Sequence, residues 1–135
     1  MLNLVPIDFG YKISTTDLQL IYTESGGVKI EVGAISIERP EHKGKRLCQN
    51  IELVFLVVAE ARCITMPFYE YNYSLIDRKL KLTGFYEVGN SQYVLEKDEY
   101  DPRKQLDLRH YIIAGYDGYV ELIASSQYSV NEKPI

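Results

Sequence analysis

The sequence has no tryptophan, two cysteines and two histidines in 135 residues. Two histidines cannot form a three-histidine metal site, and no cysteine or histidine pair has the spacing of metal ligands, so we expect no metal and no cofactor. Cys48 and Cys63 lie near opposite ends of one predicted strand, and this separation disfavours a bond between them. We expect free, buried thiols in a reducing compartment, with a disulfide as the alternative.

Long apolar segments and targeting signals are also missing. The longest uncharged apolar run, residues 53–59, is far too short to cross a bilayer. The N-terminus has no basic start followed by a long apolar stretch, so we expect no signal peptide. The sequence contains no phosphate-binding glycine loop, dinucleotide-binding glycine motif or G-x-S-x-G motif. These absences predict a cytoplasmic protein that does not contact membranes and has no recognisable enzyme signature.

Basic residues are fewer than acidic residues. The chain carries 15 lysine and arginine residues against 19 aspartate and glutamate residues, a formal net charge of −4. This balance argues against a nucleic-acid-binding protein, which would need a basic face. We interpret the basic residues at 38–50, including His42, and the acidic residues at 96–101 as solvated loops. The alternatives are an acid- or phosphate-binding patch for the first and a surface that steers a basic partner for the second.

Tyrosine, in contrast, is abundant, with twelve copies. Apolar residues recur at every second position in several short runs, turn residues separate these runs, and no long amphipathic helix is evident. The pattern predicts an all-β chain, with residues 1–135 forming a single domain. We expect an antiparallel sandwich or barrel of about eight strands, with at most one short helix. Residues 125–135 are predicted to be a partly frayed C-terminal tail.

The first half of the chain predicts an edge strand and a hairpin. Residues 4–9 are predicted to form a short strand or a docked arm, and Pro6 favours an edge position. The turn at Ser25-Gly26-Gly27 is predicted to pair Tyr22 with Ile30, and a bulge or bend at Gly33 would explain a change in the apolar phase.

Residues 51–64 form the longest apolar segment. Alternation and β-branched side chains predict one long central strand. Such a strand can bend across two layers, and a buried helix is the alternative.

The segment from Leu108 to Ala124 predicts a central hairpin covered on both faces. Its register has two alternatives. A two-residue turn pairs Ala114 with Tyr119 and places His110 and Glu121 on one face. A bulged turn with Gly118 in the left-handed region separates these two side chains. We favour the bulged turn, because glycine accepts a positive φ freely.

The segment 92–100 is ambiguous. Asn90 or Ser91 can cap a short helix there, or residues 93–95 can return as a strand. The strand is slightly favoured.

A set of tyrosines is the main candidate binding site. In a predicted strand at 67–75, the side chains of Tyr69, Tyr71 and Tyr73 share one face, and Tyr86 lies on the following strand, predicted at 80–88. Tyrosine buries a large area at low entropic cost and keeps a polar tip, so these residues form a possible recognition surface. The alternative is a half-buried sheet face whose hydroxyl groups reach water.

Three functions are compatible with these features. The first is a small binding protein without catalysis, such as a bacterial immunity-type inhibitor or an adaptor, that holds another protein through the tyrosine-rich face. The second is a β-barrel that binds a small apolar ligand. The third is a hydrolase-like enzyme using His110 with Asp117 or Glu121. We favour the first, with a protein partner and no catalytic residues. The oligomeric state stays open.

Overall fold

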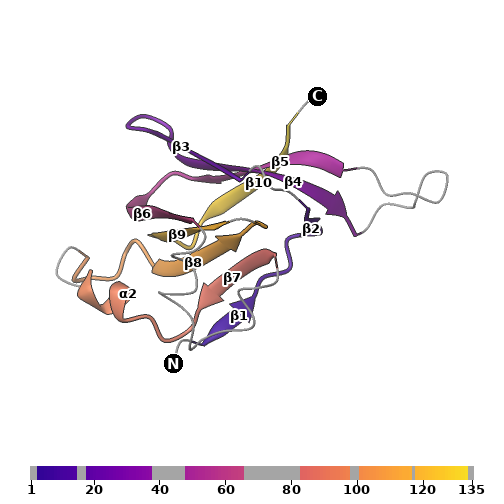
Figure 1. Cartoon of the computed structure of the whole chain (residues 1–135). Helices are drawn as coiled ribbons and strands as arrows, with labels where there is room; N and C mark the ends of the chain where they lie inside the picture. The colour runs from indigo at the N-terminus through magenta and orange to yellow at the C-terminus, as the bar shows by residue number, and fades with distance from the viewer. Residues whose placement is uncertain are drawn as a thin grey trace.

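The protein is built from two facing antiparallel sheets (Figure 1). The computed structural model describes residues 3–14, 18–37, 48–65, 83–97, 101–116 and 118–133. Sheet I has the strand order β1 (Leu4–Pro6), β7 (Gly84–Val88), β8 (Leu108–Ala114), β9 (Gly118–Ser125) and β6 (Val58–Thr65). Sheet II has the order β10 (Tyr128–Glu132), β5 (Cys48–Phe55), β4 (Gly27–Ser36) and β2 (Tyr11–Ile13), and β3 (Gln19–Thr23) also pairs with β4.

This arrangement confirms the all-β prediction and makes the fold a sandwich. The described strands form two open sheets with ten strands, rather than about eight, and one short helix, α2 (Gln92–Glu96). The described part of the chain contains no helix that is long and apolar enough to cross a membrane.

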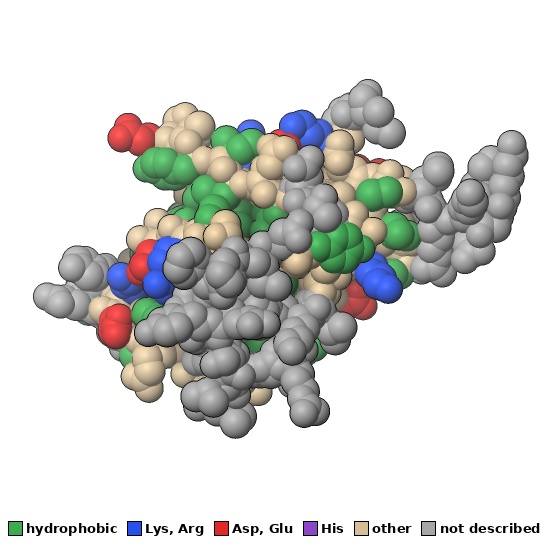
Figure 2. All heavy atoms as spheres, in the orientation of Figure 1, with side chains coloured by type: hydrophobic (Ala, Val, Ile, Leu, Met, Phe, Trp, Pro, Cys, Tyr) green, Lys and Arg blue, Asp and Glu red, His purple; other side chains and the backbone are tan. Residues whose placement is uncertain are grey.

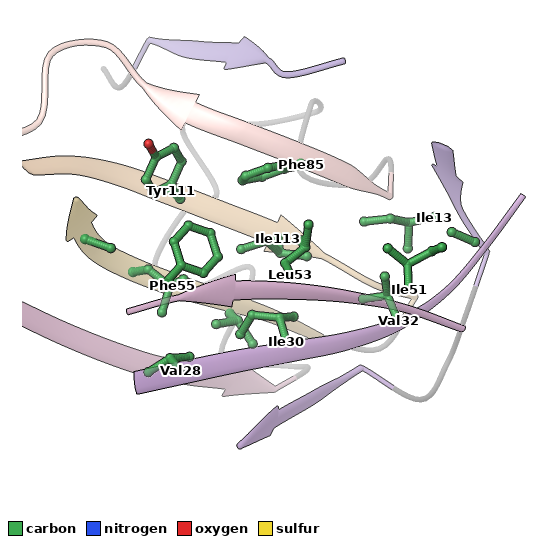
Figure 3. Packing of buried hydrophobic residues seen from close by; sticks show 14 residues of the cluster. Ile13, Val28, Ile30, Val32, Ile51, Leu53, Phe55, Phe85, Tyr111 and Ile113 are labelled. Atoms are coloured by element: carbon green, nitrogen blue, oxygen red, sulfur yellow. The ribbon is translucent and has the colours of Figure 1, made fainter. Parts of the chain in front are cut away.

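The main core lies between the two sheets (Figure 3). Strand β4 alternates strictly, burying every second side chain from Val28 to Ser36, because successive side chains of a strand point to opposite faces. Strand β5 contributes Ile51, Leu53 and Phe55 to the same space. From sheet I, β8 and β9 contribute Tyr111, Ile113, Val120, Leu122 and Ala124.

An aromatic cluster joins the sheets at the centre of this core. Phe55 of sheet II lies 5.4 Å from Tyr111 and 6.4 Å from Phe85, both of sheet I, measured between ring centroids. Tyr128 lies 5.3 Å from Phe55 and 5.4 Å from Phe85. Burial raises the pKa of Tyr111 to about 12, so its hydroxyl group stays neutral at ordinary pH.

The β8–β9 hairpin is covered on both faces, as predicted, but the favoured register is wrong. Ala114 pairs with Tyr119, and the Gly115 amide donates to the Gly118 carbonyl over 2.9 Å. Gly118 does not have a positive φ. A Cβ there would lie 2.7 Å from the carbonyl oxygen of Ile64 in β6, so glycine is required for close backbone approach. The two-residue register therefore holds, and His110 and Glu121 share a face.

The segment 51–64, predicted as one long strand that can bend across two layers, is two strands, one in each layer. The chain leaves sheet II after Phe55, turns at Leu56 and Val57, and enters sheet I as β6 at Val58. The crossover explains why the apolar run is so long, because its two halves pack in different layers. Cys48 and Cys63 therefore lie in different sheets, and both thiols are free and exposed rather than buried.

Two further register predictions need correction. Strand β3 pairs Tyr22 with Val28, not with Ile30, although the predicted inner face is kept. Strand β4 passes Gly33 without a bulge in its pairing with β5, and Ile35 lies on the outer face.

The prediction for the first strand is confirmed, whereas part of the tail that was predicted to fray is a strand. Strand β1, which contains Pro6, is an edge strand of sheet I as predicted. At the other end, the tail predicted to fray contains β10, which pairs with β5.

Candidate functional site

A pocket of about 440 Å³ lies beside α2 and the start of β8. Its lining includes the side chains of Ser91 and His110, together with the Arg109–Glu87 ion pair. The other lining residues are Val88, Gly89, Asn90, Gln92, Val94, Leu95 and Leu108. The lining therefore includes both apolar and polar residues, and His110 lies behind this surface without exposed area of its own.

A short hydrogen-bond chain runs inward from this pocket. Ser91 caps α2, where its Oγ accepts the Val94 amide over 3.3 Å. The same Oγ lies 2.7 Å from Nδ1 of His110, and Nε2 of His110 lies 2.6 Å from Oε1 of Glu121. His110 has no exposed surface. In the neutral tautomer that fits these contacts, Ser91 donates to Nδ1 and Nε2–H donates to the Glu121 carboxylate.

Arg62 of β6 forms an ion pair with the buried carboxylate of Glu121. Its Nη2 lies 3.2 Å from Glu121 Oε1, and its guanidinium group stacks over the Tyr93 ring at 4.9 Å. Tyr93 in turn meets the His110 ring edge to face. Partial burial lowers the pKa of Arg62, but the hydrogen bond to Tyr93 and the negative charges of Glu121 and Glu60 outweigh this effect and raise the pKa.

The order serine, histidine, carboxylate is one that supports nucleophilic chemistry, because the histidine can take the serine proton. Here, however, Ser91 is also a helix cap and His110 is fully enclosed. Such a chain has a second physical role, which is to join α2 to the β8–β9 hairpin by satisfying buried polar groups. Among the described residues, no group of three histidine, cysteine, aspartate or glutamate side chains could hold a metal ion.

The exposed apolar end is a different kind of candidate. We use this name for Tyr22, Leu56 and Val57, whose side chains are 65, 70 and 42% exposed. Tyr22 lies in β3, and the other two form the crossover from β5 to β6. The two segments are neighbours, because a Cβ on Gly27 would lie 2.9 Å from the Leu56 Cα and Gly27 pairs with Thr23. Figure 2 shows hydrophobic side chains along this side of the molecule, between the β3–β4 hairpin and β6.

The predicted tyrosine face is only partly described. Tyr69, Tyr71 and Tyr73 lie outside the described residues, as do His42 and Asp117. Tyr86 is 6% exposed and packs in a smaller cluster on the outer face of sheet I with Leu4, Ile112 and Tyr119. Its ring also lies over the bare Cα of Gly84. Tyr86 thus contributes packing, and the role of the other three tyrosines stays a prediction.

Sequence reasoning named His110 and Glu121 as a pair but favoured a register that separates them. It recognised Ser91 as a possible cap and favoured a strand for the segment, which is wrong because α2 begins at Gln92. It missed Arg62 as the partner of Glu121 and missed the exposed apolar end.

Comparisons with protein-family models, curated proteins and solved structures found no significant match.

Proposed function

We propose that this is a small binding protein without catalysis, which holds another protein at the exposed apolar end. The observation that carries the proposal is the exposure of the apolar side chains of Leu56 and Val57 at a crossover that directly follows the fully buried Phe55. Exposed apolar side chains that cluster on one surface are typical of protein interfaces. A net charge of −4 would favour a basic partner through electrostatic steering.

An immunity-type inhibitor or an adaptor in a bacterial cytoplasm would have these properties. The free thiols of Cys48 and Cys63 are compatible with a reducing compartment. The tyrosines at 69, 71 and 73 would extend the contact surface if they face outward as their alternation predicts.

A pull-down from the native host with mass spectrometry tests this proposal. Baits are the wild-type chain, a Leu56→Asn/Val57→Asn double variant and a Leu95→Asn control, since Leu95 is also exposed but lies on α2. We expect one specific partner with the wild type and the control, and at least a tenfold loss with the double variant, in the range of about 2 kcal/mol for interface anchors. The absence of any partner at micromolar concentration, or equal recovery with all baits, would contradict the proposal. A Tyr71→Ala bait tests the tyrosine face separately.

A second candidate is acyl transfer at Ser91, favoured by the 2.7 Å contact between its Oγ and His110 beside the pocket. In that reaction Oγ would attack the carbonyl carbon of an ester or amide while Nδ1 of His110 takes the proton, and Glu121 would hold the ring. The proton on Nδ1 would then pass to the leaving group as its bond to the carbonyl carbon breaks, and water would hydrolyse the acyl-serine. An organofluorophosphonate probe should then form one covalent adduct, detected by intact-mass spectrometry, in the wild type but not in a Ser91→Ala variant. The lack of an adduct in the folded wild type would remove this candidate.

A further inference from the structure

The edges of the two sheets differ in how they are protected. An open strand edge presents unpaired backbone groups to other chains, and proteins block it with charged residues, proline, bulges or short length. Strand β1 has three residues and contains Pro6, and β2 has three residues and contains Lys12. Strand β6 carries Glu60 and Arg62 and has a register shift after Val58. Strand β10 ends in Glu132.

Strand β3 lacks the first three of these devices and is longer than β1 and β2. Its five residues, Gln19–Thr23, include no charge and no proline, and its pairing with β4 is regular. Four of the five side chains are exposed, including Ile21 at 39%. Among the edges of the described strands, β3 is therefore the one best suited to accept another strand.

The β3 sequence is also compatible with pairing to itself. In an antiparallel pair related by a two-fold axis through Ile21, that residue faces its own copy. Leu20 then faces Tyr22 of the second copy, and Gln19 faces Thr23. Each pair joins two apolar or two polar side chains, and no like charges meet across the axis. Directly opposite residues of paired strands point to the same side of a sheet. In this register the inner faces of the two β3 strands therefore lie on the same side of the joined sheet.

We propose that two copies of the protein associate through β3, forming one continuous sheet from sheet II of each copy. The edge offers only five residues, so the interface is small and the dimer is expected to be weak, with a dissociation constant on the order of 100 μM. Leu56 and Val57 follow β5, which β4 separates from this edge, so the strand pairing itself does not use them. Tyr22 belongs to both surfaces. The homodimer does not depend on the proposed partner.

Sedimentation velocity of the purified chain over a concentration series tests the dimer. We expect concentration-dependent dimerisation of the wild type. Ile21→Lys and Ile21→Glu, each alone, should weaken it at least tenfold, because two like charges would meet at the axis. An equal mixture of these two variants should restore association, because opposite charges then meet. Val5→Lys, at a similarly exposed position on the β1 edge, is the control and should dimerise like the wild type.

Circular dichroism and melting curves establish that each variant is folded. A wild type that stays monomeric up to the highest concentration tested would overturn the proposal, and so would Ile21 variants that dimerise normally. A mixture that fails to associate would overturn the register centred on Ile21. The Leu56→Asn/Val57→Asn variant should dimerise normally, so failure of the dimer and failure of the proposed partner binding give different results.

Discussion

Replacing Phe55 with alanine should lower the free energy of unfolding by about 3–5 kcal/mol. The Phe55 ring has no exposed surface and contacts rings from both sheets, namely Phe85, Tyr111 and Tyr128. Removing it deletes buried apolar area and leaves a cavity between two sheets, each of which is kept rigid by its own backbone hydrogen bonds, so the gap cannot close easily. The loss of ring-to-ring contacts adds to the cost.

Chemical denaturation followed by circular dichroism measures this effect. Leu122→Ala, on the opposite sheet and equally buried, should cost about 3 kcal/mol. Leu56→Ala is the matched control, because the same kind of truncation at an exposed site should change the free energy of unfolding by less than about 0.5 kcal/mol. A cost near zero at both Phe55 and Leu122 would show that the core does not lie between these sheets.

Alternation alone was enough to predict the class of fold and the inner faces of several strands. In β4, for example, Val28, Ile30 and Val32 alternate with Lys29 and Glu31, and the structure buries the first set. Such a pattern reports which side of a strand is apolar. It does not report which layer the strand belongs to. This is why the continuous apolar run at 51–64 was predicted as one strand, although the chain changes sheets at Leu56 and Val57.

Registers were harder to predict because they depend on distant contacts. Gly118 is needed for the approach of Ile64, which lies far away in the sequence, whereas its neighbours suggested a need for positive φ. The same limit applies to the candidate site. Nothing local indicates that Ser91 meets His110, or that Arg62 meets Glu121, because these contacts arise only when α2, β6, β8 and β9 assemble.

Glu121→Ala should be the second large effect, with a loss of about 2–4 kcal/mol in the free energy of unfolding. The substitution removes the acceptor for His110 Nε2, which lies in a fully buried ring with no access to water. It also removes the carboxylate that pairs with Arg62. The arginine side chain is 41% exposed and can turn toward solvent, so most of the cost comes from the orphaned histidine and the cavity.

A double variant separates this network effect from simple loss of volume. In His110→Leu/Glu121→Leu the buried imidazole N–H and its carboxylate acceptor are removed together, and the Ser91 hydroxyl is the group of this chain that loses its acceptor. The cost should therefore be smaller than that of Glu121→Ala alone, which leaves the fully buried imidazole N–H unpaired. Glu87→Ala is the control, because its ion pair with Arg109 is partly exposed and should be worth less than about 1 kcal/mol. Urea denaturation of the three variants measures the differences. If Glu121→Ala costs no more than Glu87→Ala, the hydrogen-bond chain from Ser91 to Glu121 does not hold α2 and the hairpin together.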